Sequence, residues 1–101
     1  MNPEALRAYL GALGSPVSYA QARRDMGASH MRNLTEALET LMDQDAAAGR
    51  PYVAAMVISR SHPLPNRGFF DHAARLGREV GDPAAFHASE LAALGKAPAK
   101  T

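Results

Sequence analysis

The stretch VSYAQARRDMGASHMRNLTEALETLMDQDAAA, residues 17–48, predicts two helices joined by a short turn. Ser18 and Gln21 form a capping box of the S-x-x-Q type, in which the side chains satisfy free backbone N–H groups at a helix start. Gly27 closes the segment that follows, because glycine readily adopts the left-handed backbone with which many helices end. The first of the two helices is therefore predicted to be short.

The second helix is predicted over residues 28–48, where the chain has its clearest pattern. Apolar residues recur there at i, i+3, i+7, i+10 and i+11, the spacing of one helical face. They are Met31, Leu34, Leu38, Leu41 and Met42. Two starts are open, because Ser29 can cap this helix and Asn33, with Glu36 three residues later, offers a second cap.

Three further helices are predicted around this pair. Asn2-Pro3 and Asp82-Pro83 each place a capping side chain before a proline, which is the preferred order at a helix start. Glycines follow the expected C-terminal ends and stop the helices there. The three helices are predicted over residues 3–13, 69–76 and 83–94.

An unbroken apolar run, YVAAMVIS at residues 52–59, predicts a buried strand. Residues 60–68, RSHPLPNRG, contain two prolines and a glycine and predict an exposed loop or hairpin tip. Phe69-Phe70 lies between the strand and a helix, which favours core packing over a base-stacking platform. We therefore expect a mainly α fold with a small β-hairpin.

Length and composition limit the classes of function. The 101 residues predict one domain, residues 1–95, and a flexible tail at residues 96–101. The absence of cysteine excludes a disulfide framework and thiolate chemistry. The sequence has neither a signal-peptide pattern nor a run of about eighteen apolar residues, so we expect a cytoplasmic protein without a membrane partner. The net charge of +1 does not by itself demand nucleic acid.

The order of these elements resembles the winged helix-turn-helix domain. VSYAQARRDMG, residues 17–27, is similar to the start of the second helix in many such domains. RPYVAAMVISRSHPLPNRGFF, residues 50–70, resembles the strand and wing of small, mostly uncharacterised bacterial winged-helix proteins. The resemblance implies a DNA-binding architecture with additional C-terminal helices after the wing.

In a helix-turn-helix protein, the N-terminal end of the second helix enters the major groove of DNA. Arg32 can donate two hydrogen bonds to guanine, Asn33 can pair with adenine, and arginines outside this helix would contact phosphates. The expected DNA-binding residues are Arg23, Arg24, Ser29, His30, Arg32, Asn33, Arg60, His62 and Arg67. We therefore expect a sequence-specific or architectural DNA-binding protein, as a bacterial transcription regulator or a phage-derived factor.

A protein-interaction adaptor that does not bind DNA is the alternative. Acidic residues occupy the second half of the long helix, where they would repel phosphates. They are Glu36, Glu39, Asp43 and Asp45. Such a face can bind a basic partner protein or simply be solvated. Arginine is also the ordinary surface cation of this chain, and polar residues at a helix start can act as caps alone.

Catalysis and metal binding are not expected. The four histidines, His30, His62, His72 and His87, do not have the spacing of a helical metal site. The sequence contains no nucleophile elbow and no phosphate-binding glycine loop. We therefore expect no enzyme activity, no cofactor and no metal.

The small core available to a chain of this length favours association with a second copy. A homodimer through the first and last helices would present two reading helices about one DNA turn apart. The expected contact residues are Leu6, Leu10, Leu13, Phe86, Leu91 and Leu94.

Overall fold

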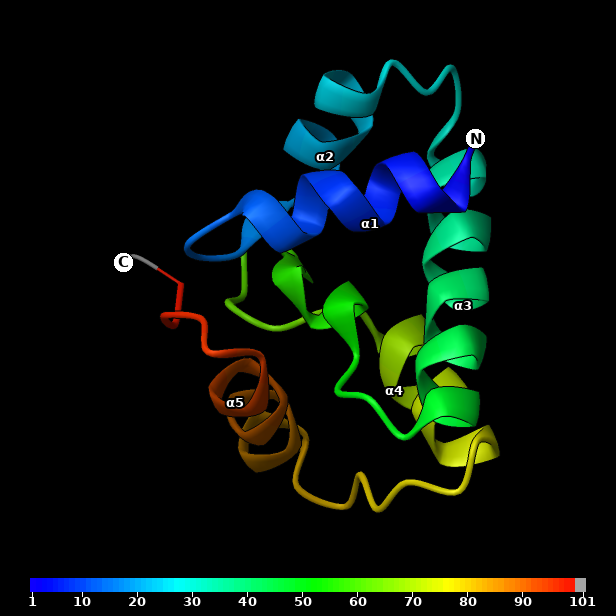
Figure 1. Cartoon of the computed structure of the whole chain (residues 1–101). Coiled ribbons are helices and arrows are strands. Elements are labelled where there is room, and N and C mark those ends of the chain that lie inside the picture. The colour runs from blue at the N-terminus through cyan, green and yellow to red at the C-terminus, as the bar shows by residue number, and fades with distance from the viewer. Residues whose placement is uncertain (100–101) are drawn as a thin grey trace.

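The computed structural model describes residues 1–99. In that part of the chain, five α-helices surround a buried central segment (Figure 1). The helices are α1 (Pro3–Ala12), α2 (Tyr19–Met26), α3 (Met31–Ala48), α4 (Arg67–Arg75) and α5 (Pro83–Leu94). In Figure 1, α1 crosses the upper half of the view, α3 runs down the right side and α5 lies at the lower left. The expectation of a mainly α fold is confirmed.

Three of the predicted helix starts are confirmed by their caps. The Ser18 hydroxyl accepts the backbone N–H of Gln21 at 3.0 Å where α2 begins. The Gln21 side chain binds Asp25 and Arg24 instead of the Ser18 N–H, so the second half of the predicted capping box does not form. The Asp82 carboxylate accepts the backbone N–H of Ala85 at 3.1 Å where α5 begins, and Asn2 caps α1 in the same way. Each cap pairs a donor that the helix itself leaves without a partner.

Half of the predicted strand is helical, and the predicted hairpin is wrong. Of residues 52–59, only Val57–Ile58 forms a strand, β2, whereas Val53–Met56 forms a 3-10 turn, η1. β2 pairs in parallel with β1 (Val17–Ser18). Because α2 and α3 lie between these strands in the sequence, the chain crosses over before it pairs, as a parallel pair requires. An apolar run alone does not distinguish a strand from a buried helical turn.

After β2 the chain forms a loop and then a helix, not a returning strand. The Ser59 N–H donates to the Leu64 carbonyl at 2.8 Å and closes a loop over residues 59–66. Asn66 then caps α4, so that this helix begins at Arg67, two residues before its predicted start. The second strand of the expected wing is therefore replaced by α4.

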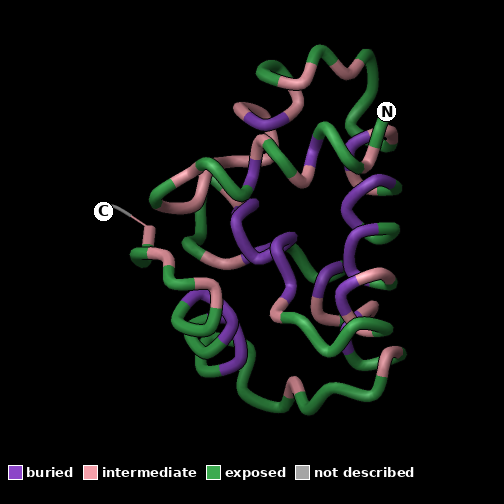
Figure 2. Tube along the Cα trace, viewed as in Figure 1, coloured by how far each residue is buried: buried purple, intermediate pink, exposed green. Residues whose placement is uncertain are grey.

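The core lies around residues 52–58, every one of which is buried (Figure 2). The ring of Tyr52 packs edge-on against Phe69 and Phe86, with ring centroids 6.2 and 6.3 Å apart. Phe70 is half-buried beside Phe69. These contacts confirm the prediction that the Phe69-Phe70 pair packs in the core.

A buried carboxylate on α3 holds the start of η1. Asp45 is fully buried, and its Oδ2 accepts the Val53 N–H at 3.1 Å. Its Oδ1 accepts hydrogen bonds from Arg7 Nη1 at 2.8 Å and from Arg50 Nε at 3.0 Å. The expectation that Asp45 lies on a solvated acidic face is therefore wrong, because it falls one turn after Leu41 on the inward face of α3.

A second buried carboxylate, Glu90 on α5, holds the preceding amide. Its Oε1 accepts the Tyr52 N–H at 2.9 Å and its Oε2 accepts Arg78 Nη2 at 2.9 Å. The consecutive amides of Tyr52 and Val53 thus bind carboxylates from two different helices. Buried charges are tolerated when they are paired and hydrogen-bonded, and each carboxylate oxygen here has a partner.

A buried histidine also joins α5 to the central segment. His87 is 4% exposed, and its Nε2 lies 2.9 Å from the carbonyl oxygen of Ala55. Burial lowers the pKa of His87 below its ordinary value of 6.5. The neutral ring therefore carries its proton on Nε2 and donates it to the Ala55 carbonyl.

The apolar residues expected at a homodimer contact lie largely inside the single chain. Four of them are buried in the core and two are half-buried against it: Leu6, Leu10, Phe86 and Leu91, then Leu13 and Leu94. Dimerisation stays a prediction, and its expected contact surface is already used within one chain.

The tail predicted at residues 96–101 is described as far as residue 99, and residues 100–101 lie outside the described residues. Lys96 Nζ donates to the Gly11 carbonyl at 2.7 Å, and the Ala97 N–H donates to the Gly14 carbonyl at 3.1 Å. The beginning of the tail therefore docks on the C-terminal end of α1.

Asp45→Asn is expected to lower the free energy of unfolding by about 2–4 kcal/mol, because it removes the charge that pairs with Arg7 and Arg50. Urea denaturation followed by circular dichroism measures the change. Asp71→Asn is the matched control, since Asp71 is an exposed carboxylate 3.5 Å from Arg67 and its loss should cost less than about 0.5 kcal/mol. Equal losses for the two variants would contradict the role given to Asp45.

His87→Gln is expected to weaken the pH dependence of stability. The folded chain keeps the ring neutral while the unfolded chain binds a proton near pH 6.5, so stability falls as the pH is lowered from about 7.5 to 5. Glutamine can still donate to Ala55 but does not titrate, so the variant loses less stability over this interval. His62→Gln, at an exposed histidine, should keep the wild-type dependence of the unfolding free energy on pH, measured by urea denaturation at several pH values. If His87→Gln also keeps that dependence, His87 is not its cause.

Candidate nucleic-acid interface

A four-residue turn, residues 27–30, joins α2 to α3. Gly27 adopts φ 67°, the left-handed region, and the Ala28 N–H donates to the Arg23 carbonyl at 3.0 Å. Arg23 Nη1 donates back to the Ala28 carbonyl at 3.0 Å. Arg23, expected to contact phosphates, thus also holds the turn together. Two helices joined by a short turn containing glycine are typical of a helix-turn-helix unit.

The start of α3 is exposed and has no side-chain cap. His30 occupies the N-cap position without a side-chain hydrogen bond, so neither Ser29 nor Asn33 caps the helix as predicted. Ser29, His30 and Arg32 are exposed, whereas Asn33 is half-buried and lines a hollow beside the start of α1. The first N–H groups of a helix carry its partial positive charge. This end of α3 is therefore suited to bind an anion or a base edge.

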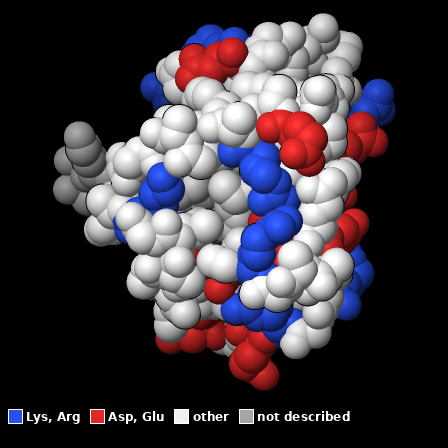
Figure 3. Space-filling view, viewed as in Figure 1, with Lys and Arg blue, Asp and Glu red and all other residues white. Residues whose placement is uncertain are grey.

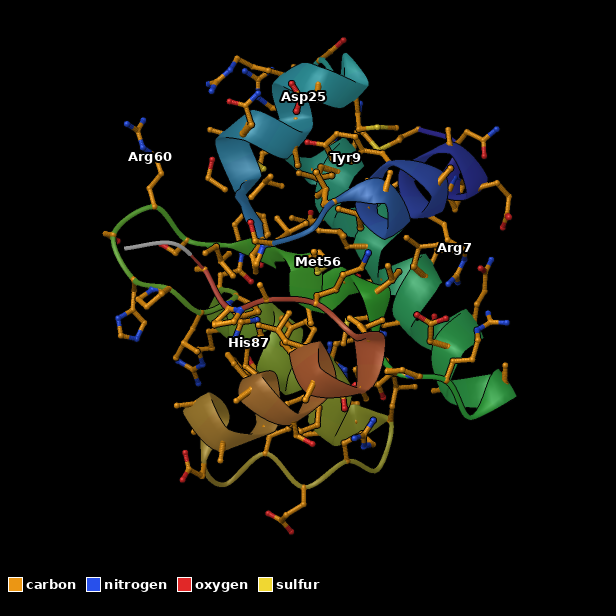
Figure 4. All side chains as sticks on the ribbon, turned by 60° about the vertical axis from the view of Figure 1, so that its left-hand side comes forward. Arg7, Tyr9, Asp25, Met56, Arg60 and His87 are labelled. Carbon is orange, nitrogen blue, oxygen red and sulfur yellow. The ribbon has the colours of Figure 1, made fainter. Side chains whose placement is uncertain are left out.

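A chain of hydrogen bonds joins α1 to α2 and reaches Arg24. Tyr9 points from α1 toward Asp25 on α2 and donates to its Oδ2 at 2.5 Å (Figure 4). Asp25 Oδ1 also accepts Gln21 Nε2 at 2.6 Å, and Gln21 Oε1 accepts Arg24 Nη2 at 3.0 Å. Burial and the Asp25 carboxylate raise the pKa of Tyr9 to about 12, so its hydroxyl stays a donor at neutral pH. Arg24 is thus held at one edge of its guanidinium and remains exposed.

The remaining expected residues lie in and after the loop of residues 59–66. Arg60 and His62 are exposed, and Figure 4 shows Arg60 projecting away from the rest of the molecule. The side chain of Arg67, at the start of α4, is 92% exposed. This loop is held beside the start of α2, because the Asn66 N–H donates to the Tyr19 hydroxyl at 3.0 Å.

The expected DNA-binding residues therefore form two groups. One group lies at the C-terminal end of α2 and the turn after it, and the other lies beside the start of α2, a helix of eight residues that is about 12 Å long. The turn group, around residues 27–30, comprises Arg23, Arg24, Ser29, His30, Arg32 and Asn33, and the loop group comprises Arg60, His62 and Arg67.

A basic cluster near the other end of α3 was not predicted. It consists of Arg7, Arg50 and Arg78 around the buried carboxylates of Asp45 and Glu90. Figure 3 shows Lys and Arg side chains in a band down the middle of this view of the molecule. The sequence carries a signal for it, because Asp45 and Glu90 follow Leu41 and Phe86 by one turn on the apolar face of their helices. An acid in an apolar stripe indicates a buried ion pair.

Residues 1–99 contain neither a cluster of metal ligands nor a membrane-spanning helix. No three His, Asp or Glu side chains gather there as metal ligands would. None of the helices formed by these residues is both long enough and apolar enough to cross a bilayer.

Comparisons of the chain with protein-family models, with curated proteins and with solved structures found no match. The function of the turn group and of the loop group is therefore inferred from their own geometry and chemistry.

Gly27→Ala is expected to destabilise the chain by about 1–2 kcal/mol, because a Cβ strains the left-handed backbone even though nothing lies within 4 Å of it. Gly11→Ala is the opposite control. Gly11 lies in α1 with open space around it, so alanine should stabilise the chain by about 0.5–1 kcal/mol. Thermal and urea unfolding measure both changes. Stabilisation by Gly27→Ala would rule out the turn described for residues 27–30.

Proposed function

We propose that the chain binds double-stranded DNA with the start of α3 in the major groove. The observation that carries this proposal is the exposed N-terminus of α3, which has no side-chain cap and is surrounded by Ser29, His30 and Arg32. Its backbone N–H groups can bind a phosphate, and Arg32 can donate two hydrogen bonds to a guanine edge. A bacterial transcription regulator or a phage-derived DNA-binding factor is the class that this chemistry favours.

The acidic side chains of α3 limit how the helix meets DNA. Glu36 is exposed about one turn after Arg32, and Glu39 and Asp43 are exposed further along. Each turn advances by about 5.4 Å, and unscreened repulsion extends over about 8 Å at physiological salt. We therefore infer that α3 enters the groove by its first turn and does not lie along it.

The loop of residues 59–66 is proposed to take the place of the wing in a winged helix-turn-helix protein. Arg60 and His62 are exposed on this loop, and Arg67 follows it. The parallel pairing of β1 with β2 and the Tyr19–Asn66 hydrogen bond support its position beside α2. We expect the loop group to contact phosphates while the turn group reads bases.

A second candidate function is binding of a basic protein partner. The observation that favours it is the row of exposed carboxylates on α3, formed by Glu36, Glu39 and Asp43. Asp45 does not belong to this row, since it is fully buried. An adaptor of this kind would not associate with duplex DNA.

Fluorescence anisotropy with a random-sequence duplex, titrated at salt concentrations between about 50 and 200 mM, separates the two candidates. We expect association that weakens as salt rises. Arg24→Ala and Arg60→Ala, one from each basic group, should each reduce the log–log salt slope by about 0.9, because each removes one phosphate contact.

Arg75→Ala is the matched control, because Arg75 is exposed on α4 and its side chain contacts His72 within its own helix. Its salt slope should equal that of the wild type. No association at low salt would exclude DNA binding and leave the adaptor. Equal slopes for Arg24→Ala, Arg60→Ala and the control would remove both basic groups from the interface.

A further inference from the structure

A pocket of about 460 Å³ lies where the end of α3, the start of η1 and α5 meet. Apolar walls are formed by Ala46, Pro51, Leu76 and Ala93. Polar groups come from Arg50, Tyr52, Arg78, Ser89 and Glu90. The pocket is therefore concave and combines apolar walls with polar groups, as small-molecule sites do, and its polar share is high.

Two guanidinium groups line this pocket, and each is held from behind by a buried carboxylate. Arg50 uses Nε for Asp45 at 3.0 Å, and Arg78 uses Nη2 for Glu90 at 2.9 Å. The side chains of Arg50 and Arg78 remain 52% and 39% exposed. Within residues 1–99, the Nη1 and Nη2 atoms of Arg50 make no hydrogen bond, so these donors remain for a ligand.

The charges around the pocket do not cancel. Arg7 and Arg50 pair with Asp45, while Arg78 pairs with Glu90. Three guanidinium charges therefore surround two carboxylates in this cluster, of which Arg50, Arg78 and Glu90 line the pocket, and one positive charge is left over. A ligand with a single negative charge would complete the balance.

Tyr52 supports Arg78 from beneath. It is fully buried, and its ring lies under the Arg78 guanidinium, with Cζ 5.2 Å from the ring centroid. Burial raises the pKa of the Tyr52 hydroxyl, and the neighbouring Arg78 guanidinium opposes this rise. Arg78 is therefore held in place by the Tyr52 ring as well as by Glu90.

We propose that this pocket binds a small carboxylate with a single negative charge and a compact apolar body. The two oxygens of a carboxylate match the planar fork of a guanidinium, which Arg50 and Arg78 offer. The apolar body would pack against Pro51, Leu76 and Ala93. This site lies at the opposite end of α3 from the turn group and does not depend on the proposed function.

A phosphate would suit the pocket less well. A phosphate monoester brings close to two negative charges near neutral pH, which exceeds the one uncompensated charge. A phosphodiester has the correct charge, but it places polar ester oxygens against the apolar walls.

Isothermal titration of the full chain with benzoate, benzamide and dimethyl phosphate tests the proposal. Benzoate should bind saturably, while benzamide, which has the same shape without the charge, and dimethyl phosphate should bind at least about tenfold more weakly. No saturable binding of benzoate would overturn the proposal. Equal binding of benzamide would also overturn it, and tighter binding of dimethyl phosphate would assign the site to a phosphodiester.

Arg50→Lys locates the site. Lysine keeps the positive charge beside Asp45 but lacks the planar fork of the guanidinium, so the affinity for benzoate should fall by about tenfold.

Arg75→Lys is the matched control, because Arg75 is exposed on α4 and does not line the pocket. It should bind benzoate with the affinity of the wild type. Equal affinities of the two variants would place benzoate outside this pocket and overturn the proposal.

Discussion

Two buried carboxylates hold the centre of the molecule, and the surrounding helices depend on them. Asp45 from α3 and Glu90 from α5 accept the consecutive backbone N–H groups of Val53 and Tyr52. The carboxylate oxygens also accept hydrogen bonds from arginines of α1, of the segment after α3 and of the segment after α4. Because a buried charge is costly without these partners, the packing of α1, α3 and α5 around η1 is coupled.

This arrangement places chemistry at both ends of α3. The helix has 18 residues and is about 27 Å long. Its start, outside the carboxylate cluster, is exposed beside a turn that Gly27 and Arg23 hold. Its end contributes to a pocket in which the same arginines that neutralise Asp45 and Glu90 face solvent. The start of α3 is thus proposed to bind DNA, and the pocket at its end is proposed to bind a small carboxylate.

The helices were predictable from local signals, whereas the centre was not. Ser18 and Asp82 act as the caps that their positions indicate, because capping involves only neighbours in the sequence. The 3-10 turn at Val53–Met56 depends instead on Asp45 and Glu90, which lie far from it along the chain. The pairing of β1 with β2 is likewise set by how α2 and α3 pack. For the candidate site, residue types indicated the turn group, but only the fold separates it from the loop group.

Amide hydrogen exchange at Tyr52 and Val53, measured by NMR at neutral pH, tests the role of the buried carboxylates most directly. If Asp45 and Glu90 hold these amides, both should exchange only through global unfolding, with the same protection as amides in the middle of α3. The hydrogen exchange of exposed amides in the loop of residues 59–66 gives the unprotected reference. Exchange at Tyr52 and Val53 as fast as in that loop would contradict the account.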